Sequence, residues 1–324
     1  MGRVLERLDE LYAIGSTRVG GSAEEDAAHA LAAQWLEAAG LGVETDEVGN
    51  LFGRRGAGDV WTGSHLDTVP DGGRFDGALG VVGAIEVAER TGVPLTVVAF
   101  RAEETGCVGS RACAAARRLP RAFVELHVEQ GPVLERADEP LGVVTGILGQ
   151  VRADVVFEGR ADHAGTTPMD ARADALVAAA EYVLKVRDVA RRDGVVATVG
   201  RLTAEPGAGN VVPARVSLSV DARGTDLDAL VADLGLVPNY RTEPVAMSDP
   251  PLAALRAAAP RAPELVSGAG HDAGILAAAG VPAGMLFVRS LNGGASHSPR
   301  ELSSADDIAL AIDALEEALI RIAS

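Results

Sequence analysis

Two different patterns of hydrophobic and polar residues follow one another along this chain. The continuous apolar run from Leu95 to Phe100 predicts a strand that is buried on both faces of a parallel sheet. Further elements are predicted from short apolar runs and from helical periodicity: strands at 43–52 (paired), 59–63, 123–128 and 284–288, and helices at 79–89 and 305–322. Strands that alternate with helices in this way predict an α/β fold, with a mostly parallel sheet flanked by helices on both faces.

An N-terminal helix is predicted by its start signal. Ser22 followed by Glu25 is a capping-box pattern, so we expect a helix over residues 23–39. The residues expected to share its buried face are Ala27, Leu31 and Trp35. This arrangement leaves His29 on the exposed side of the helix, as a surface histidine with no role.

The middle of the chain changes to an alternation of apolar and polar residues. Every second position is apolar from Val151 to Phe157 and again from Val216 to Val220, which predicts strands with one solvent-exposed face. A helix is predicted between them, over residues 174–191. We therefore expect a smaller α+β domain at 149–248, inserted into a catalytic domain made of two pieces, 1–148 and 249–324.

Charge and cysteine content narrow the kind of protein this can be. The 324 residues have a formal net charge of −17, which disfavours nucleic acid and anionic membranes as partners. No apolar run approaches the ~18 residues of a membrane span, and the charged N-terminal stretch lacks the apolar centre of a signal peptide. Cys107 and Cys113 form an isolated pair, which favours reduced thiols and a cytoplasmic protein.

Candidate chemistry is concentrated in five short motifs: GSHLD (63–67), FDGALG (75–80), AEETG (102–106), ELHVEQG (125–131) and GASHS (294–298). Histidines and acids in these motifs fall at or just beyond the C-terminal ends of predicted strands. Ligand sites of open α/β sheets lie at those ends. The set predicts a site for two divalent metal ions, which lower the pKa of a bound water to ~7 and so supply a nucleophile at neutral pH.

Spacing indicates how the first two motifs could serve such a site. Asp67 lies two residues after His65, so its carboxylate can orient the imidazole ring from behind. Asp76 lies in a glycine-rich loop from which it could reach both metals and bridge them.

The remaining motifs supply a base and further ligands. Glu103 and Glu104 are adjacent, so their side chains point in different directions, and one can bind a metal while the other accepts a proton. His127 and His297 would complete two half-sites. Neutral imidazole and carboxylate suit zinc, manganese, cobalt or nickel, and the sequence does not choose among them.

The motifs resemble those of the dinuclear-metal aminoacylase and exopeptidase superfamily. More narrowly, the chain is similar to its ureido-hydrolysing branch, the allantoate amidohydrolases and N-carbamoyl-L-amino-acid hydrolases. The stretches that narrow the resemblance are HVEQGPVLE (127–135), ADHAGTTPMDARADAL (161–176), GNVVP (209–213), GAGHDA (268–273) and GGASHSPRE (293–301). The segments 111–125 and 224–248 are shorter than in such proteins. The resemblance therefore does not define how the pocket wall and the dimer contact are built in this chain.

The resemblance implies a role for each matching residue. The implied ligands are His65, Asp76 and His127 for one metal, and Asp76, Glu104 and His297 for the other. Glu103 would be the general base, and His163 would stabilise the oxyanion by reaching across from the lid of a partner subunit. Asn210 and Arg223 would bind the carboxylate of the substrate, with Gln130 nearby. The inserted domain would be this lid and would join two copies into a homodimer.

These observations predict a metal-dependent amidohydrolase that cleaves a ureido or carbamoyl C–N bond of a small carboxylated substrate, either allantoate or an N-carbamoyl-L-amino acid. The nearest alternative is a dipeptidase or aminoacylase with the same metals, but the peptidase branch usually has an acid where this chain has His127. A non-catalytic metal-binding homologue is disfavoured by the intact Glu103. A nucleotide-binding protein is disfavoured because DGGRFDGALG lacks the G-x-G-x-x-G spacing. His271 and Asp272 are expected to line or brace the site, with no firm role.

Overall fold

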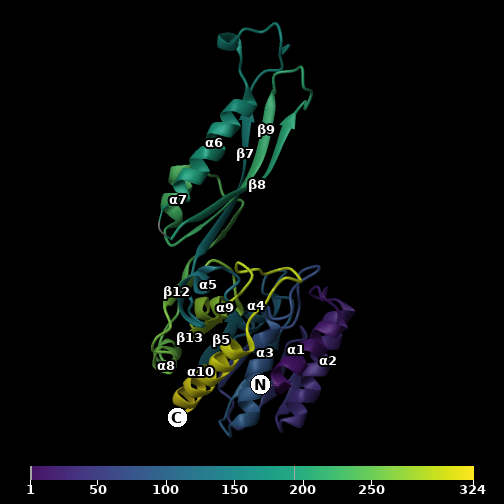
Figure 1. The fold of residues 1–324 in the computed structure, drawn as a ribbon, viewed down its shortest axis with the longest axis vertical. Coiled ribbons are helices and arrows are strands. Elements are labelled where there is room, and N and C mark those ends of the chain that lie inside the picture. The colour runs from purple at the N-terminus through teal and green to yellow at the C-terminus, as the bar shows by residue number, and fades with distance from the viewer. Residues whose placement is uncertain (1, 193) are drawn as a thin grey trace. The chain divides into compact units, whose positions relative to one another are not determined.

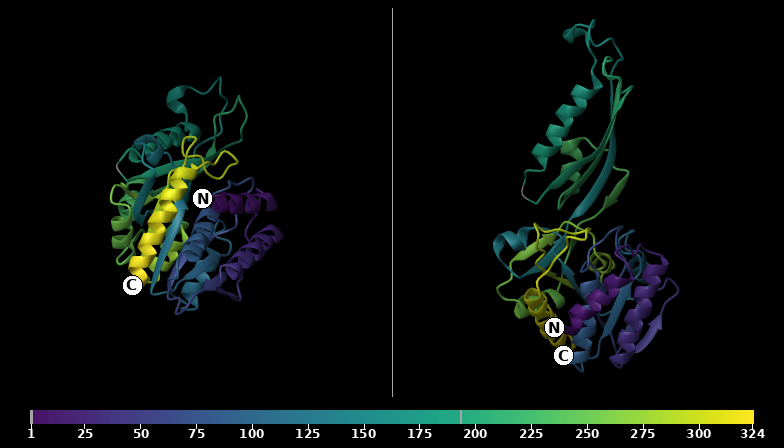
Figure 2. Two further views of the ribbon diagram at one scale, coloured as in Figure 1. Left: turned by 60° about the horizontal axis from the view of Figure 1, so that its bottom comes forward. Right: turned by 45° about the vertical axis from the view of Figure 1, so that its right-hand side comes forward.

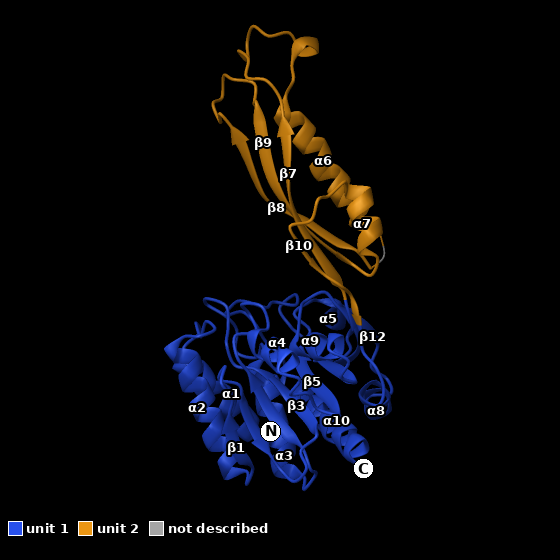
Figure 3. Ribbon diagram, turned by 180° about the vertical axis from the view of Figure 1, so that it is seen from behind, with its two compact units in different colours: residues 1–147, 246–324 blue, residues 148–245 orange. Residues whose placement is uncertain are grey.

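The computed structural model describes residues 2–192 and 194–324. Contacts between residues divide the chain into two compact units (Figure 3), residues 1–147 with 246–324 (unit 1) and residues 148–245 (unit 2). The sequence pattern predicts an inserted segment that runs from residue 149 to residue 248. Each unit has its own sheet and its own apolar core, as expected of a separate domain.

Unit 1 is the larger unit and contains most of the elements labelled in Figure 1. Its helices are α1 (Gly2–Ile14), α2 (Ala23–Ala38), α3 (Ala78–Arg90), α4 (Val108–Ala115), α5 (Val133–Ala137), α8 (Pro251–Ala258), α9 (Asp272–Ala278) and α10 (Ala305–Ala323). The strands of its sheet are β1 (Gly42–Thr45), β2 (Leu51–Arg54), β3 (Val60–His65), β4 (Thr96–Phe100), β5 (Ala122–Val128), β6 (Leu141–Ile147), β11 (Val245–Ala246), β12 (Glu264–Ser267) and β13 (Ala283–Val288).

The sheet of unit 1 has a parallel centre. Its strand order is β1-β2-β4-β3-β5-β13-β6-β11, with β12 also paired to β6. The pairs β4–β3, β3–β5 and β5–β13 are parallel, whereas β1, β2 and β6 join in antiparallel register. Residues of β3, β4, β5 and β13 are buried along their whole length, which explains why these strands have continuous apolar runs.

Helices cover both faces of this sheet. Gly83 of α3 packs against Leu126 of β5 and Ile312 of α10. A Cβ placed on this glycine would lie 2.9 Å from the side chain of Leu126 and 3.8 Å from that of Ile312. On the other side, the N–H of Ala273 in α9 donates to the carboxylate of Glu125 at 2.8 Å. Glu125 and Leu126 are adjacent in β5, and adjacent strand residues point to opposite faces of a sheet. Helices α3 and α10 therefore pack on one face, and α9 packs on the other. Figure 2 shows α10, in yellow, lying along the strands. The predicted α/β class is confirmed.

Unit 2 is an antiparallel sheet covered by helices. Its elements are β7 (Gly149–Glu158), a 3-10 turn (Met169–Ala171), α6 (Ala175–Val189), β8 (Val196–Glu205), β9 (Arg215–Gly224), α7 (Leu227–Leu234) and β10 (Tyr240–Thr242). The strand order is β10-β7-β9-β8. Burial alternates strictly along β9, as the alternating sequence predicts, and the buried residues pack against α6 and α7.

The predicted face of α2 is wrong in part, because Leu31 and Trp35 are half-buried and pack against the core but are not the most buried residues of the helix. Its buried residues are Glu25, Ala28, His29, Ala32 and Leu36, whereas Ala27 is exposed. His29 is only 7% exposed, and its Nε2 lies 3.9 Å from Glu25 Oε1. The error arises because the buried face includes two polar side chains, which a search for apolar periodicity excludes. His29 is therefore a buried residue, not a surface histidine.

None of the described helices combines the length and the apolar composition that crossing a bilayer requires.

Candidate metal centre

The residues that the motifs single out lie at one edge of the unit 1 sheet. His65 is the last residue of β3, and His127 lies one residue before the end of β5. The turn after β4, the loop after β13 and the turn before α3 supply the others, which are Glu103, Glu104, His297 and Asp76. Because β3, β4, β5 and β13 are parallel, their carboxyl ends meet at this edge.

Asp76 turns one carboxylate oxygen toward each of two groups of residues. Its Oδ1 lies 3.2 Å from His127 Nε2 and 3.8 Å from His65 Nε2. Its Oδ2 lies 3.3 Å from Nε2 of His297, which is itself 3.4 Å from Glu104 Oε1. Within each group, the candidate ligand atoms all lie within 4.8 Å of one another. The structure thus brings the five candidate ligands together in two groups that share Asp76.

The two buried histidines present the nitrogen atom that a metal requires. His127 Nδ1 donates to the carbonyl of Val128 at 2.9 Å, and His65 Nδ1 donates to the carbonyl of Asp67 at 3.1 Å. A ring that uses its Nδ1 proton in this way has its lone pair on Nε2. Asp76 Oδ1 and His127 Nε2 are buried and have no hydrogen-bond partner among the described residues. A cation between these atoms would offset the cost of burying them unpaired, so the group fits a divalent metal ion.

Asp67 supports both a ligand and the base candidate. Its Oδ1 lies 3.3 Å from His65 Nδ1 and accepts the backbone N–H of Glu103 at 3.0 Å, while its Oδ2 accepts the N–H of Glu104 at 3.1 Å. Burial on its own would raise the pKa of Asp67, but these hydrogen bonds outweigh it and the pKa is lowered. Asp67 therefore stays ionised and fixes three neighbours at once.

Glu103 is in a position to exchange a proton beside the metal groups. Its side chain is 10% exposed, and its Oε2 lies 3.8 Å from His65 Nε2. Burial is the main reason that its pKa is raised well above the usual range; His65 opposes this shift, and Asp272 adds to it. Cys107, which the sequence analysis did not connect to the site, donates its thiol to Glu103 Oε1 at 3.5 Å. A carboxylate with a raised pKa is a stronger base than an ordinary carboxylate.

Gln130 lies against the second group. Its Nε2 is 2.8 Å from Asp76 Oδ2 and 3.3 Å from His297 Nε2. Its backbone has a positive φ of 57°, and its N–H donates to Ser290 Oγ at 3.1 Å. The family resemblance implies that Gln130 lies near the carboxylate of the substrate, and in the structure its amide contacts the candidate ligands themselves.

Comparison with known proteins identifies the family. Residues 61–321 match the sequence model of peptidase family M20/M25/M40. The chain belongs to this family. Together with the two residue groups, family membership indicates the use of divalent metal.

Two relatives and one solved structure resemble nearly the whole chain. An N-carbamoyl-L-amino acid amidohydrolase from Geobacillus stearothermophilus is 38% identical over 397 aligned positions, covering 97% of this chain and 96% of that protein. An allantoate amidohydrolase from Bacillus subtilis (strain 168) is 35% identical, covering 89% and 88%. The crystal structure of an amidase of the hydantoinase/carbamoylase family from Burkholderia multivorans has a TM-score of 0.90 and 31% identity, covering 99% and 97%. The predicted resemblance to the ureido-hydrolysing branch of the M20 family is confirmed.

Three further residues implied by the M20 resemblance lie in unit 2. His163 and Asn210 are neighbours, because the N–H of Ala164 donates to the carbonyl of Asn210 at 3.0 Å. Both residues are exposed. Arg223 lies at the other end of β9, eight residues beyond Arg215, which is roughly 27 Å along a strand. Its Nε is 3.0 Å from Asp221 Oδ1. Within unit 2, His163 and Asn210 are together and Arg223 is apart from them.

A third group of potential ligands, Glu125, His127 and His271, lies behind the metal centre. Two of its three members already have hydrogen-bond partners: Ser64 Oγ donates to Glu125 Oε1 at 2.6 Å, and His271 Nε2 is 2.8 Å from Ser267 Oγ. The rings of His127 and His271 stack edge to face, with centroids 4.6 Å apart. We therefore interpret Glu125 and His271 as a buried wall that holds His127 in place.

Glu301 was missed by the sequence analysis, although the motif GGASHSPRE ends on it. Its carboxylate is buried and accepts the backbone N–H groups of Phe75 and Asp76. Burial raises the pKa of Glu301 to about 7, and the nearby Asp76 adds to the shift. Only its place directly after the His297 motif could have marked it, because nothing in the sequence relates it to a segment more than 200 residues earlier.

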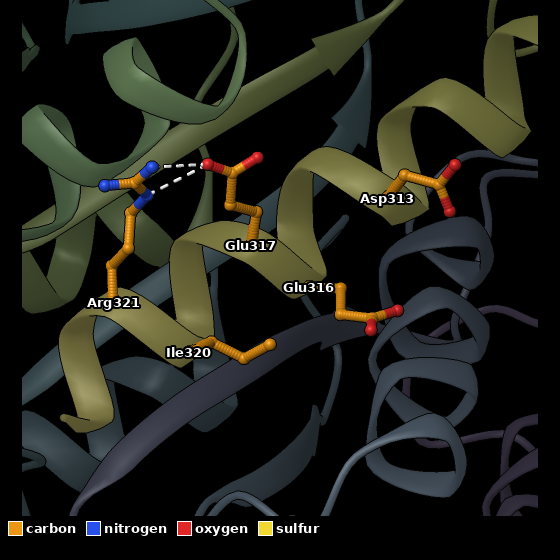
Figure 4. A pocket seen from close by; sticks show the side chains of 5 residues that line it. All are labelled: Asp313, Glu316, Glu317, Ile320 and Arg321. Carbon is orange, nitrogen blue, oxygen red and sulfur yellow. Dashed lines mark hydrogen bonds and ion pairs between the residues drawn. The ribbon is translucent and has the colours of Figure 1, made fainter.

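A separate hollow on the surface of α10 is unrelated to this chemistry (Figure 4). It is lined by Asp313, Glu316, Glu317, Ile320 and Arg321. Its one cation, Arg321, is held by Glu317 at 2.5 Å, so the hollow offers an anionic ligand little charge to bind.

Proposed function

We propose that this protein is a metal-dependent amidohydrolase that cleaves a ureido or carbamoyl C–N bond of a small carboxylated substrate, allantoate or an N-carbamoyl-L-amino acid. One observation carries the proposal: Asp76 directs one oxygen to His65 and His127 and the other to His297, as a residue shared by two metals must. The names of the relatives support the substrate class. A cytoplasmic location stays a prediction of the sequence.

Two divalent ions would be held by residues of unit 1. The first would bind His65, Asp76 and His127, and the second Asp76, Glu104 and His297. Neutral imidazole and carboxylate are suitable ligands for zinc, manganese, cobalt or nickel. Such ions supply positive charge that acidifies water and stabilises a developing oxyanion. Asp76 suits the shared position because its neighbouring histidines keep its pKa low despite its burial.

Glu103 would act as the general base and then as the general acid. Its carboxylate takes a proton from the attacking water, whose oxygen forms a bond to the carbonyl carbon. The C–N bond then breaks, and Glu103 returns the proton to the leaving nitrogen. This cleavage gives one nitrogen product and a carbamic acid, which then breaks down to carbon dioxide and the second nitrogen product. The final products are an amine, ammonia and carbon dioxide. The burial of Glu103 supports this role because it raises the pKa toward the range in which both transfers are possible.

Residues of unit 2 would bind the substrate, with the unit serving as a lid. Arg223 and Asn210 would hold the carboxylate of the substrate, and His163 would donate to the oxyanion. The distance between Arg223 and the His163–Asn210 pair along unit 2 supports a homodimer, in which one copy supplies Arg223 and the other supplies His163 with Asn210.

The test is ammonia release from a panel of substrates by purified protein reloaded separately with zinc, manganese, cobalt or nickel. The panel contains allantoate, several N-carbamoyl-L-amino acids, N-acetyl amino acids and dipeptides. We expect ammonia from allantoate or from at least one carbamoyl compound, and no cleavage of the peptides. Cleavage of dipeptides or acetyl compounds without ammonia from any ureido compound would instead support the aminoacylase alternative.

A further inference from the structure

Glu301 joins two segments that both supply candidate metal ligands. It lies in the loop between β13 and α10, four residues after His297, and is only 6% exposed. Its Oε2 accepts the backbone N–H of Phe75 at 2.6 Å and that of Asp76 at 3.1 Å. The carboxylate therefore connects the segment of the shared ligand Asp76 to the segment of His297.

Ser296 makes a second connection between the same segments. Its Oγ lies 3.2 Å from Asp76 Oδ2 and 3.4 Å from Glu301 Oε1. A serine hydroxyl has one proton, so it donates to one of these carboxylates at a time. The His297 segment thus holds both the backbone and the side chain of Asp76.

The shape of the Asp76 segment leaves room for this carboxylate. A Cβ at Gly73 would lie 2.0 Å from Glu301 Oε2 and 2.3 Å from its Cδ. The positive φ angles in this region belong to other residues, so Gly73 is required for space and not for its backbone conformation. The segment 73–76 wraps closely around one side chain, and that side chain is an acid.

Burying the Glu301 carboxylate beside Asp76 lowers the stability of the fold unless other interactions offset it. Burying a carboxylate costs free energy that hydrogen bonds must offset, and the like charge of Asp76 lies nearby. Two backbone N–H groups offset that cost here, and both belong to the Asp76 segment. An apolar side chain would fill the space without fixing those groups.

We propose that Glu301 is a positioning residue of the metal centre, which fixes the backbone of Asp76 and, with Ser296, sets its carboxylate relative to His297. This inference rests on the proposed function only for the use of these residues as metal ligands, and it is independent of the substrate. Glu301 itself binds no metal. Its loss leaves the ligands in the chain but lets Asp76 move relative to His297.

The test is calorimetric titration of zinc or cobalt into metal-free protein. We expect Glu301→Ala to weaken the binding of at least one ion by about 10–100-fold, the range typical of partners that orient ligands. Glu301→Gln keeps one carbonyl oxygen that can accept from the backbone, so it should retain part of the affinity. Ser296→Ala should lose less than Glu301→Ala. The cobalt absorption bands should change in shape in the variants, because the ligand arrangement changes.

The matched control is Asp174→Ala in unit 2. Asp174 also accepts two backbone N–H groups, those of Leu176 and Val177, but it caps α6 and contacts no candidate ligand. We expect it to bind metal like the wild type. If Glu301→Ala and Glu301→Gln also bind metal like the wild type and only unfold at a lower temperature, Glu301 is merely structural and the proposal is wrong.

The two proposals fail in different ways. A wild-type protein that binds two ions but releases no ammonia would refute the amidohydrolase activity and leave the role of Glu301 to be decided by the titration. A wild-type protein that binds no divalent ion would refute both.

Discussion

Asp67 Oδ1 accepts the backbone N–H of Glu103 at 3.0 Å, so the residue that contacts the candidate ligand His65 also fixes the candidate base. In Asp67→Asn, one carboxylate oxygen becomes an NH₂ group that cannot accept a hydrogen bond. We expect the neighbouring N–H of Glu103 or Glu104 to lose its partner. The ring of His65 keeps its hydrogen bond to the backbone carbonyl of residue 67 but loses the negative charge that lies 3.3 Å from its Nδ1. Metal affinity and turnover should each fall by about 10–100-fold, as measured by metal titration and ammonia release.

The control for this variant is Asp226→Ala, which removes the oxygen that accepts the N–H of Ala229 at the start of α7. Turnover should be unchanged there. Equal losses in the two variants would mean that any lost backbone cap impairs the enzyme, and that Asp67 has no special position.

Glu103 and Glu104 are adjacent, but replacing each with glutamine should impair different properties of the protein. Glu103→Gln removes the base and leaves the ligands in place, so we expect normal metal content and a loss of turnover of about 10²–10⁴-fold. Glu104→Gln removes a ligand, so the protein should retain less metal after dialysis. Metal content by mass spectrometry and ammonia release separate the two. A Glu103→Gln protein that loses metal as Glu104→Gln does would make Glu103 a ligand.

The clustering of the candidate ligands could be predicted because most of them lie at strand ends. His65, His127 and the Glu103–Glu104 pair each follow a short apolar run, and parallel strands bring such positions to one edge. Glu301 could not be found in this way, because its effect is exerted through backbone N–H groups that have no sequence signature. The same limit explains His29, since a buried polar face looks like a solvent-exposed one in a hydrophobicity pattern.

Gly77 should tolerate no side chain. Its φ is +62°, and a Cβ would lie 2.4 Å from the ring of His65. We expect Gly77→Ala to lower the free energy of unfolding by about 1–3 kcal/mol and to weaken metal binding, because the ring must move. Chemical denaturation and metal titration measure the two effects.

Gly40→Ala is a control that introduces backbone strain without the clash that a side chain at position 77 would make with His65. Gly40 has a similar φ of +77°, but a Cβ there would meet nothing within 4 Å. This variant should lose stability and keep its metal affinity. If both variants keep full affinity, the contact between Gly77 and His65 does not matter for the site.

His29 should make stability depend on pH. Burial, with a smaller effect of Arg101, lowers its pKa from 6.5 to about 3. Between these values the unfolded chain binds a proton that the folded chain does not, so stability falls as the pH falls. From about pH 7.5 to about pH 5.5, His29 should cost about 1.4 kcal/mol of unfolding free energy.

The comparison of the wild type with His29→Gln isolates this contribution, because other titrating groups are common to both proteins. Urea denaturation at a series of pH values should show a steeper loss for the wild type below about pH 6.5 and a constant difference above about pH 7.5. Parallel curves through the whole range would mean that His29 is protonated in the folded protein.

His163 and Arg223 should complement each other between subunits if the active site is shared. We expect His163→Ala and Arg223→Ala each to lose most of their ammonia release. When the two inactive proteins are dissociated and reassociated together, a mixed dimer has one site with a wild-type Arg223 from one copy and a wild-type His163 from the other. Random mixing makes about half of the dimers mixed, so about a quarter of the wild-type activity should return. If both residues serve a site in their own copy, each site lacks one of them and no activity returns.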